Sequence, residues 1–400
     1  MSKKQQGPLA GVRVLDIATV FAAPFAASLL GDYGAEVLKV ELPGIGDALR
    51  GMQPTEASES MAWVALARNK RSITLDLRKE KGQDLFLKLL KDYDVLLENF
   101  RPGTLEKWGI SIERMREANP NLIITSVSGY GKTGPYSSRA GFGTSATAFS
   151  GYTYMNGFPD RPPLSPPMPL ADYVTGLFAA LGTLAAIYHR DAKGGEAQEV
   201  DASLFESMFR ILEANVTAYD RLGIIKERAG NEFSNSAPVG TFQTSDGKWL
   251  ALTTSTDRTF HRLAEVIGRP EMKTDPNFAT NQARVARREE VNSIVAKWFS
   301  EHTAKSIQHL CDENGVPVSQ IYSMEDIFQD PQYVARDAIV EVDHPTLGKV
   351  KVPGVAPKFT KTPGSVRRAG PILGEHNHEV YQNLGLTSAE IEQLEKEGII

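Results

Sequence analysis

The sequence contains a single cysteine, Cys311, so no disulfide can form within the chain. One cysteine in 400 residues is typical of a protein from a reducing compartment, and we expect a cytoplasmic location. Residues 1–7 carry charge but lack the apolar stretch of a secretory signal. The longest apolar run follows Asp172. It is interrupted by glycine and threonine, and we expect it to be too short to cross a membrane.

Basic residues are not in excess, and the spacings typical of metal ligands are missing. Lys and Arg number 44 against 49 Asp and Glu, which gives a net charge of -5. This balance excludes a basic nucleic-acid footprint over the whole surface, and no nucleic-acid partner is expected. None of the 7 histidines is spaced His-x-x-x-His, and a lone cysteine cannot form Cys-x-x-Cys. The sequence therefore predicts no metal site.

What the chain does have is a repeated alternation of apolar strands and helices. Helices of amphipathic or small-residue pattern are expected over 24–33 and 80–91, between segments typical of buried strands. This order predicts an open, mostly parallel, Rossmann-like α/β sheet, in which ligands bind at loops beyond the carboxyl ends of the strands. The expected strands are 12–17, 35–41, 72–77, 95–99 and 122–127, and the expected binding loops are 19–24, 42–50, 99–103 and 128–143.

A chain of this length is too long for one core, so two domains are expected. The turn Asp246-Gly247 predicts a hairpin over 240–252 in the second domain. Helices are expected after it over 258–267, 288–299 and 304–313. The predicted parts are a large α/β domain (1–221), a small α+β domain (222–325) and a proline-rich C-terminal strap (326–400) that returns to the large domain.

Asp172 stands where a proline-rich loop, 158–169, gives way to a helix of small apolar residues that runs to Arg190. A helix that is apolar on nearly every face belongs in a core. A carboxylate at its start faces unpaired backbone N–H groups and the positive end of the helix dipole, which favours its ionised form. Two interpretations stay open at this point: a helix N-cap, the more frequent role of such an aspartate, and a catalytic carboxylate.

Basic and aromatic residues gather on loops at the expected edge of the sheet. Residues 68–71 are Arg-Asn-Lys-Arg, and Arg101 and Lys107 are close in sequence to Phe100 and Trp108. Scattered basic residues are usually only solvated surface. Together with the aromatic rings, these suit a ligand that carries phosphates and a ring, such as a nucleotide.

Several motifs resemble those of the class III coenzyme A transferases, the CaiB/BaiF family. The resemblance spans essentially the whole chain, with the motifs in the family's order. They are Gly-Val-Arg-Val-Leu-Asp (11–16), Ala-Ala-Pro (22–24), Gly-Ala-Glu-Val-Leu-Lys-Val-Glu (34–41), Asn-Lys-Arg-Ser (69–72), Glu-Asn-Phe-Arg-Pro-Gly (98–103), Asn-Pro (119–120) before Leu-Ile (122–123), Ser-Gly-Tyr-Gly (128–131) and Pro-Ile-Leu-Gly-Glu-His-Asn (371–377). The resemblance implies a ring-shaped chain that forms a homodimer of two interlocked rings.

The resemblance also implies an active site. It assigns the nucleophile to Asp172, the aspartate before the small-residue helix. It places coenzyme A, as an acyl-CoA co-substrate and without a metal, on loops of the large domain. The implied coenzyme A contacts are Phe21, Ala22, Leu75, Asp76, Leu77, Arg78, Asn99, Phe100, Arg101, Lys107, and the loop from Ala140 to Gly143.

The implied reaction moves CoA from an acyl-CoA donor to a carboxylic acid acceptor, through a mixed anhydride and an aspartyl-CoA thioester on Asp172. One thioester replaces another, so neither ATP nor a metal is needed. Backbone N–H groups at the helix start are candidates to hold the oxyanion. The acid pocket is expected to be lined from the loop before Asp172 by Tyr152, Tyr154, Met155, Phe158 and Arg161.

Two departures from the formyl-CoA/oxalate branch argue against oxalate as the acid. Thr-Thr-Ser-Thr-Asp (253–257) replaces a glycine-rich loop, and Phe21 replaces a polar residue. A CoA-ester racemase or epimerase is one alternative, but it needs a second base, and Phe142 and Thr144 flank Gly143 where that branch has a His-Asp pair. A non-catalytic CoA-binding protein is the other alternative, and the presence of Asp172 argues against it.

Overall fold

The computed structural model describes residues 7–233 and 235–400, which form two compact units. Unit 1 comprises the described residues up to Tyr152 together with Ser165–Thr217 and Gln332–Ile400. Unit 2 comprises Thr153–Leu164 and the described part of Ala218–Pro331. Residues 153–164 were predicted to belong to the large domain, whereas in the structure this segment groups with unit 2.

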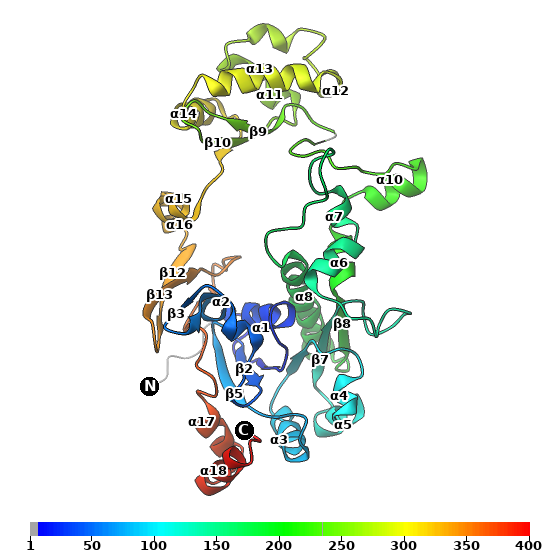
Figure 1. The fold of residues 1–400 in the computed structure, drawn as a ribbon, viewed down its shortest axis with the longest axis vertical. Coiled ribbons are helices and arrows are strands. Elements are labelled where there is room, and N and C mark those ends of the chain that lie inside the picture. The colour runs from blue at the N-terminus through cyan, green and yellow to red at the C-terminus, as the bar shows by residue number, and fades with distance from the viewer. Residues whose placement is uncertain (1–6, 234) are drawn as a thin grey trace. The chain divides into compact units, whose positions relative to one another are not determined.

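Unit 1 is built on a six-stranded parallel sheet with the order β5-β2-β1-β6-β7-β8 (Figure 1). The strands are β1 (Arg13–Asp16), β2 (Glu36–Glu41), β5 (Lys70–Thr74), β6 (Val95–Glu98), β7 (Ile123–Ser128) and β8 (Glu199–Ser203). The predicted α/β class is therefore confirmed. Sequence analysis misses β8 because Glu-Val-Asp-Ala-Ser is mostly polar, which an edge strand tolerates.

Helices cover both faces of this sheet. On one face, α1 (Ala22–Asp32), α8 (Leu170–Lys193) and α9 (Leu204–Arg210) pack closely through alanines and other small residues. On the other face, α3 (Glu80–Leu90) buries its leucines and Phe86, as its amphipathic pattern predicts. Shorter elements of unit 1 are η1 (Ala48–Gly51), β3 (Thr55–Glu56), β4 (Glu59–Ser60), α2 (Met61–Leu66), α4 (Thr104–Lys107), α5 (Ile112–Ala118) and α6 (Gly143–Phe149).

Helix α8 corrects two expectations. It is continuous over 24 residues, so by length and composition alone it is long and apolar enough to cross a membrane. It is also not buried all round: Ala171, Ala179 and other small residues face the sheet. The opposite side exposes Leu177 (55%), Leu181 (62%) and Tyr188 (58%) within the single chain. The buried face packs against protein, and the other lies uncovered in one chain.

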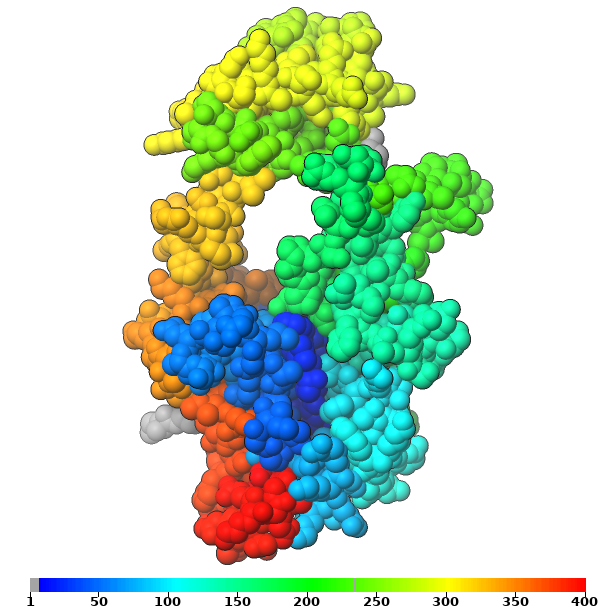
Figure 2. Space-filling model, viewed as in Figure 1, coloured from blue at the N-terminus to red at the C-terminus, as the bar shows by residue number. Residues whose placement is uncertain are grey.

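Residues 332–400 form the last part of unit 1. They pair β12 (Ile339–His344) with β13 (Gly348–Pro353) and end in α17 (Asn377–Asn383) and α18 (Ser388–Lys396). The hydroxyl of Tyr381 donates a hydrogen bond to the carbonyl of Thr74 at 2.6 Å. The Asp76 N–H donates to the Ile399 carbonyl at 2.7 Å. Figure 2 shows these C-terminal residues, in red, packed against the light-blue surface around residue 80.

Unit 2 contains the predicted hairpin, β9 (Val239–Gln243) and β10 (Trp249–Thr253), extended by β11 (Val318–Gln320) into an antiparallel sheet. The predicted helices appear as α11 (Asp257–Val266), α13 (Arg288–Ser300) and α14 (Ala304–Asn314), with η2 (Pro270–Lys273), α12 (Asn281–Ala286) and α15 (Met324–Gln329) between or after them. Cys311 is fully buried in this core, and burial raises the pKa of its thiol to about 12. The remaining helices, at the boundaries of the two units, are α7 (Tyr152–Met155), α10 (Asn215–Leu222) and α16 (Pro331–Ala335).

Candidate active site

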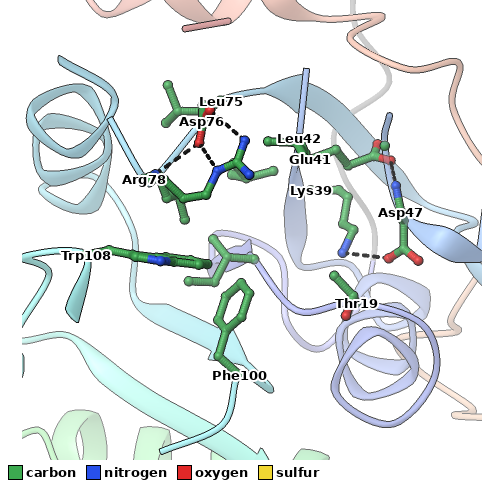
Figure 3. A pocket seen from close by; sticks show the side chains of 14 residues that line it. Thr19, Lys39, Glu41, Leu42, Asp47, Leu75, Asp76, Arg78, Phe100 and Trp108 are labelled. Atoms are coloured by element: carbon green, nitrogen blue, oxygen red, sulfur yellow. Dashed lines mark hydrogen bonds and ion pairs between the residues drawn. The ribbon is translucent and has the colours of Figure 1, made fainter. Parts of the chain in front are cut away.

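A cavity of about 260 Å³ opens at the carboxyl edge of the parallel sheet, as expected for this class of fold. The loops after β1, β2, β5 and β6 supply its walls (Figure 3). The rings of Phe100 and Trp108 meet edge to face, with centroids 5.1 Å apart. The cavity therefore offers an aromatic wall of the kind that binds a flat ring.

The other wall of this cavity is polar. The Arg78 guanidinium donates to both oxygens of Asp76, at 2.7 and 2.8 Å, and these hydrogen bonds hold the pKa of the Asp76 carboxyl below its usual value. The Arg78 side chain remains half exposed, so its charge is also available to a ligand. Five of the predicted coenzyme A contacts thus lie together here: Leu75, Asp76, Leu77, Arg78 and Phe100.

Asp172 lies in the first turn of α8, two residues after its first residue, Leu170. The helix has Pro169 at its N-cap position, and no side chain caps it. Asp172 is therefore not the N-cap residue, and its carboxylate does not cap the helix.

The Asp172 carboxylate packs directly against Gly143, the first residue of α6. A Cβ atom added to Gly143 would overlap Oδ2 of Asp172, so only glycine leaves room for the carboxylate. Among the described residues, no Lys, Arg or His forms an ion pair with Asp172. Burial therefore raises the pKa of its carboxyl to about 6, opposed only by a backbone hydrogen bond. A half-buried, unpaired carboxylate with a raised pKa is typical of a catalytic group.

Phe21 and Ala22 lie beside the same turns of α8. The Tyr173 ring stands edge-on to Phe25 at 5.0 Å and is 6.0 Å from the ring of Phe21. A Cβ on Gly176 would come within 2.7 Å of the Ala22 carbonyl oxygen, so the glycine allows α1 and α8 to approach closely. The structure thus places the predicted Gly143 against Asp172, and the predicted Phe21 and Ala22 beside the first two turns of the helix that carries it.

The remaining predicted contacts lie outside this cavity. The Asn99 side chain is occupied by a loop: its amide donates to the Thr19 carbonyl at 2.7 Å and its oxygen accepts from the Thr19 N–H at 2.8 Å. Arg101, Lys107 and Ala140 are exposed, and Arg101 borders a separate small hollow next to Glu98. Their role in binding stays a prediction.

The structure also shows two buried residues that the sequence analysis does not select. Lys39 and Asp47 both line the cavity, and their side chains are only 1% exposed. The available signal is Lys39 itself, because a lysine inside the apolar strand Val-Leu-Lys-Val needs a buried partner. Among the residues that the structure describes, no cluster of three or more His, Cys, Asp or Glu side chains is arranged to hold a metal.

The residues expected to line the acid pocket divide between the units. Tyr152 belongs to unit 1, while Tyr154, Met155, Phe158 and Arg161 belong to unit 2. Within unit 2, the Tyr154 hydroxyl donates to Glu227 at 2.6 Å. The Arg161 side chain is 69% exposed, so its guanidinium is not committed to the interior.

A cavity at the carboxyl edge of a parallel α/β sheet, together with a half-buried carboxylate in the same unit, is the arrangement of an α/β enzyme. CoA-transferase family III matches residues 9–377, and the chain belongs to this family of CoA-transferases. The chain is 42% identical over 401 residues to succinyl-CoA–D-citramalate CoA-transferase of Chloroflexus aurantiacus, with 100% of both chains covered. It is 44% identical over 398 residues to the beta subunit of succinyl-CoA–L-malate CoA-transferase of the same organism, with 98% of each covered.

A solved structure supports the same assignment. The crystal structure of a CaiB/BaiF family protein from Brucella suis matches with a TM-score of 0.84 and 32% identity, covering 95% of this chain and 100% of that one. The resemblance drawn from the motifs is therefore confirmed.

Proposed function

We propose that this enzyme transfers CoA between small dicarboxylic acids, with succinyl-CoA as a donor and Asp172 as the nucleophile. The observation that carries the proposal is the Asp172 carboxylate, which is half-buried against Gly143 and has no ion-pair partner among the described residues. The printed names of the two Chloroflexus relatives, both more than 40% identical, support the substrate class, because succinate, citramalate and malate are all dicarboxylic acids.

In the proposed first half-reaction, Asp172 attacks the thioester carbonyl of the donor. A carbon–oxygen bond forms, the carbon–sulfur bond breaks, and the CoA thiolate leaves behind a mixed anhydride. The thiolate then attacks the aspartyl carbonyl of the anhydride and releases the donor acid as its carboxylate. Asp172 is left as an aspartyl-CoA thioester.

The second half-reaction is the reverse with a new acid. The acceptor carboxylate attacks the aspartyl carbonyl and expels the thiolate, which gives a second anhydride. Attack of the thiolate on the acceptor carbonyl forms the product thioester and frees the Asp172 carboxylate. Each step keeps the acyl group at high energy, whereas a serine ester would lose that energy.

The cavity suits the nucleotide end of the CoA substrate in this proposal. The edge-to-face pair of Phe100 and Trp108 supplies a surface for the adenine ring, and the half-exposed Arg78 supplies charge for phosphate. Phe21 lies near Tyr173 and Ala22 near Gly176, in the first two turns of the helix that carries Asp172, where the thioester must arrive.

The proposal includes a cytoplasmic homodimer. The exposed stripe of Leu177, Leu181 and Tyr188 on α8 supports a partner, since apolar side chains of this size gain from being covered.

The mechanism is tested by looking for a covalent adduct on Asp172. Incubation with succinyl-CoA and no acceptor is expected to leave a labile adduct on Asp172. Hydroxylamine should convert it to a hydroxamate, and borohydride should reduce the thioester to an alcohol, both visible by mass spectrometry of the peptide. Deuterium exchange at the substrate α-carbon with Asp172 unmodified would instead indicate a racemase. No adduct and no released thiol would indicate a CoA-binding protein without catalysis.

A further inference from the structure

Val20 has an unusual backbone conformation immediately before the active site. Its φ is +67°, in the left-handed region, and it is the one β-branched residue among the non-glycine residues with positive φ that the structure describes. A β-branched side chain is strained there, because its Cβ substituents crowd the backbone. Such strain persists only when surrounding groups hold it, and it often marks a functional segment.

Side chains bond to each of three consecutive residues of this turn. The Ala18 carbonyl accepts a hydrogen bond from Lys39, and the Ala18 N–H donates to Asp16 at 3.1 Å. The side-chain amide of Asn99 accepts a hydrogen bond from the Thr19 N–H and donates one to the Thr19 carbonyl. The Val20 N–H donates to both carboxylate oxygens of Asp47, each at 3.1 Å.

Asp47 is itself fixed on every side. Its Oδ1 accepts from the Leu49 N–H at 2.9 Å and caps η1, and its own N–H donates to Glu41 at 2.9 Å. Oδ2 lies 3.2 Å from Nζ of Lys39. Burial disfavours the charge of Asp47, but Lys39 and the two backbone donors outweigh it and lower the pKa of the carboxyl. The ionised form therefore persists at neutral pH.

The turn leads directly into the residues around Asp172. Phe21 follows Val20 and reaches the Tyr173 ring, and the Ala22 carbonyl contacts α8 at Gly176. Lys70 bonds the Pro24 carbonyl at 2.7 Å and Asp16 at 2.8 Å, which ties the first turn of α1 to the same buried charges.

We propose that Asp47, held by Lys39, is a positioning residue: it keeps Val20 in its left-handed conformation and thereby fixes Phe21 and Ala22 against the first two turns of α8, which carry Asp172. Asp47 acts through the turn and does not itself contact the reacting atoms. This inference rests on the proposed role of Asp172. The short segment from Ala18 to Ala22 thus connects the sheet-edge cavity with the helix that carries the nucleophile.

The test compares two substitutions of Val20 in an Asp47→Asn background. Asp47→Asn is expected to lower kcat by about 10- to 100-fold, the size expected for a misplaced active-site segment, and to change KM for the acyl-CoA less. Adding Val20→Gly should restore most of the lost kcat, because glycine adopts positive φ without being held. Adding Val20→Ala should not restore kcat, because alanine removes the same branched side chain but keeps the Cβ that disfavours positive φ. Each Val20 substitution alone should lower kcat less than Asp47→Asn does, because Asp47 still holds the turn through the backbone N–H of residue 20.

Three results would overturn the proposal: an unchanged kcat in Asp47→Asn, rescue by both Val20 substitutions, or rescue by neither. Rescue by neither is also the expected result if Asp47 contacts the substrate. If Asp47→Asn does not fold, Asp47→Glu serves the same comparison, since it keeps a charge for Lys39 but displaces the oxygens from the Val20 N–H. The adduct on wild-type Asp172 is measured in parallel, so failure of the nucleophile assignment is distinguished from failure of the positioning role.

Discussion

The carboxylate of Asp172 is buried beside Gly143, with a pKa raised from 3.8 to about 6. A raised carboxyl pKa means that the folded state binds its proton more tightly than the unfolded chain does. Ionised Asp172 therefore costs stability at neutral pH, and that cost disappears as the pH falls to about 4.

Asp172→Asn should consequently abolish transfer and still stabilise the protein at pH 7. The gain is expected to be about 1–3 kcal/mol, and it should vanish near pH 4, where both side chains are neutral. Urea unfolding at a series of pH values measures this difference. Asp191→Asn, at the exposed end of the same helix, is the control: it should keep transfer activity, and it should not stabilise the protein because it removes an ion pair to Arg190. A destabilised Asp172→Asn at pH 7 would contradict the assigned burial cost.

The same pKa predicts how the rate depends on pH. The nucleophile must be ionised, so kcat is expected to fall about tenfold for each pH unit below about 6 and to level off above it. Initial rates between pH 4.5 and 8 with saturating substrates measure this limb. If kcat instead falls only around pH 4, Asp172 is solvated when substrate is bound.

Among the elements, α8 depends on a polar contact in a layer of small residues. The Thr125 and Thr183 hydroxyls are 2.7 Å apart and fully buried, and Thr183 donates onward to the Ala179 carbonyl. Thr183→Val should leave the Thr125 hydroxyl without its acceptor and cost about 1–3 kcal/mol in free energy of unfolding. The double variant Thr125→Val/Thr183→Val should recover most of that loss. Equal losses in the single and double variants would mean that packing, not the hydrogen bond, matters there.

The elements also show what the sequence could predict. Strands with continuous apolar runs and the Asp246-Gly247 hairpin were predictable, because burial on both faces or a tight turn leaves a local signal. The edge strand β8 was not, because its polar residues resemble a loop. The exposed stripe on α8 was not, because its residues are as apolar as those on the buried face of the same helix.

The site was predictable only in part. The motifs name Asp172 and the cavity residues Leu75 to Arg78. Asp47 was not predicted, and Asn99 was predicted only as a coenzyme A contact, because both act on the backbone of a loop distant in sequence. Separations of 27 residues for Asp47 and 80 for Asn99 leave no periodic pattern.

For the whole molecule, the prediction is a homodimer whose chains do not separate on dilution. Threaded rings part only when one chain unfolds, so dissociation should follow unfolding kinetics. Light scattering is expected to show a dimer down to nanomolar concentration. Tagged and untagged dimers should exchange subunits only after denaturation and refolding. A monomer at nanomolar concentration, or exchange under native conditions, would exclude interlocking.

The burial of Cys311 has a practical consequence for assays. Its thiol is fully enclosed and its pKa is about 12, so almost none is present as the reactive thiolate at neutral pH. A disulfide reagent added to the native enzyme should titrate no protein thiol, and after unfolding it should titrate one per chain. Any thiol detected with the native enzyme is then free CoA lost by hydrolysis of a thioester or anhydride, so this side reaction can be followed continuously without correction for the enzyme.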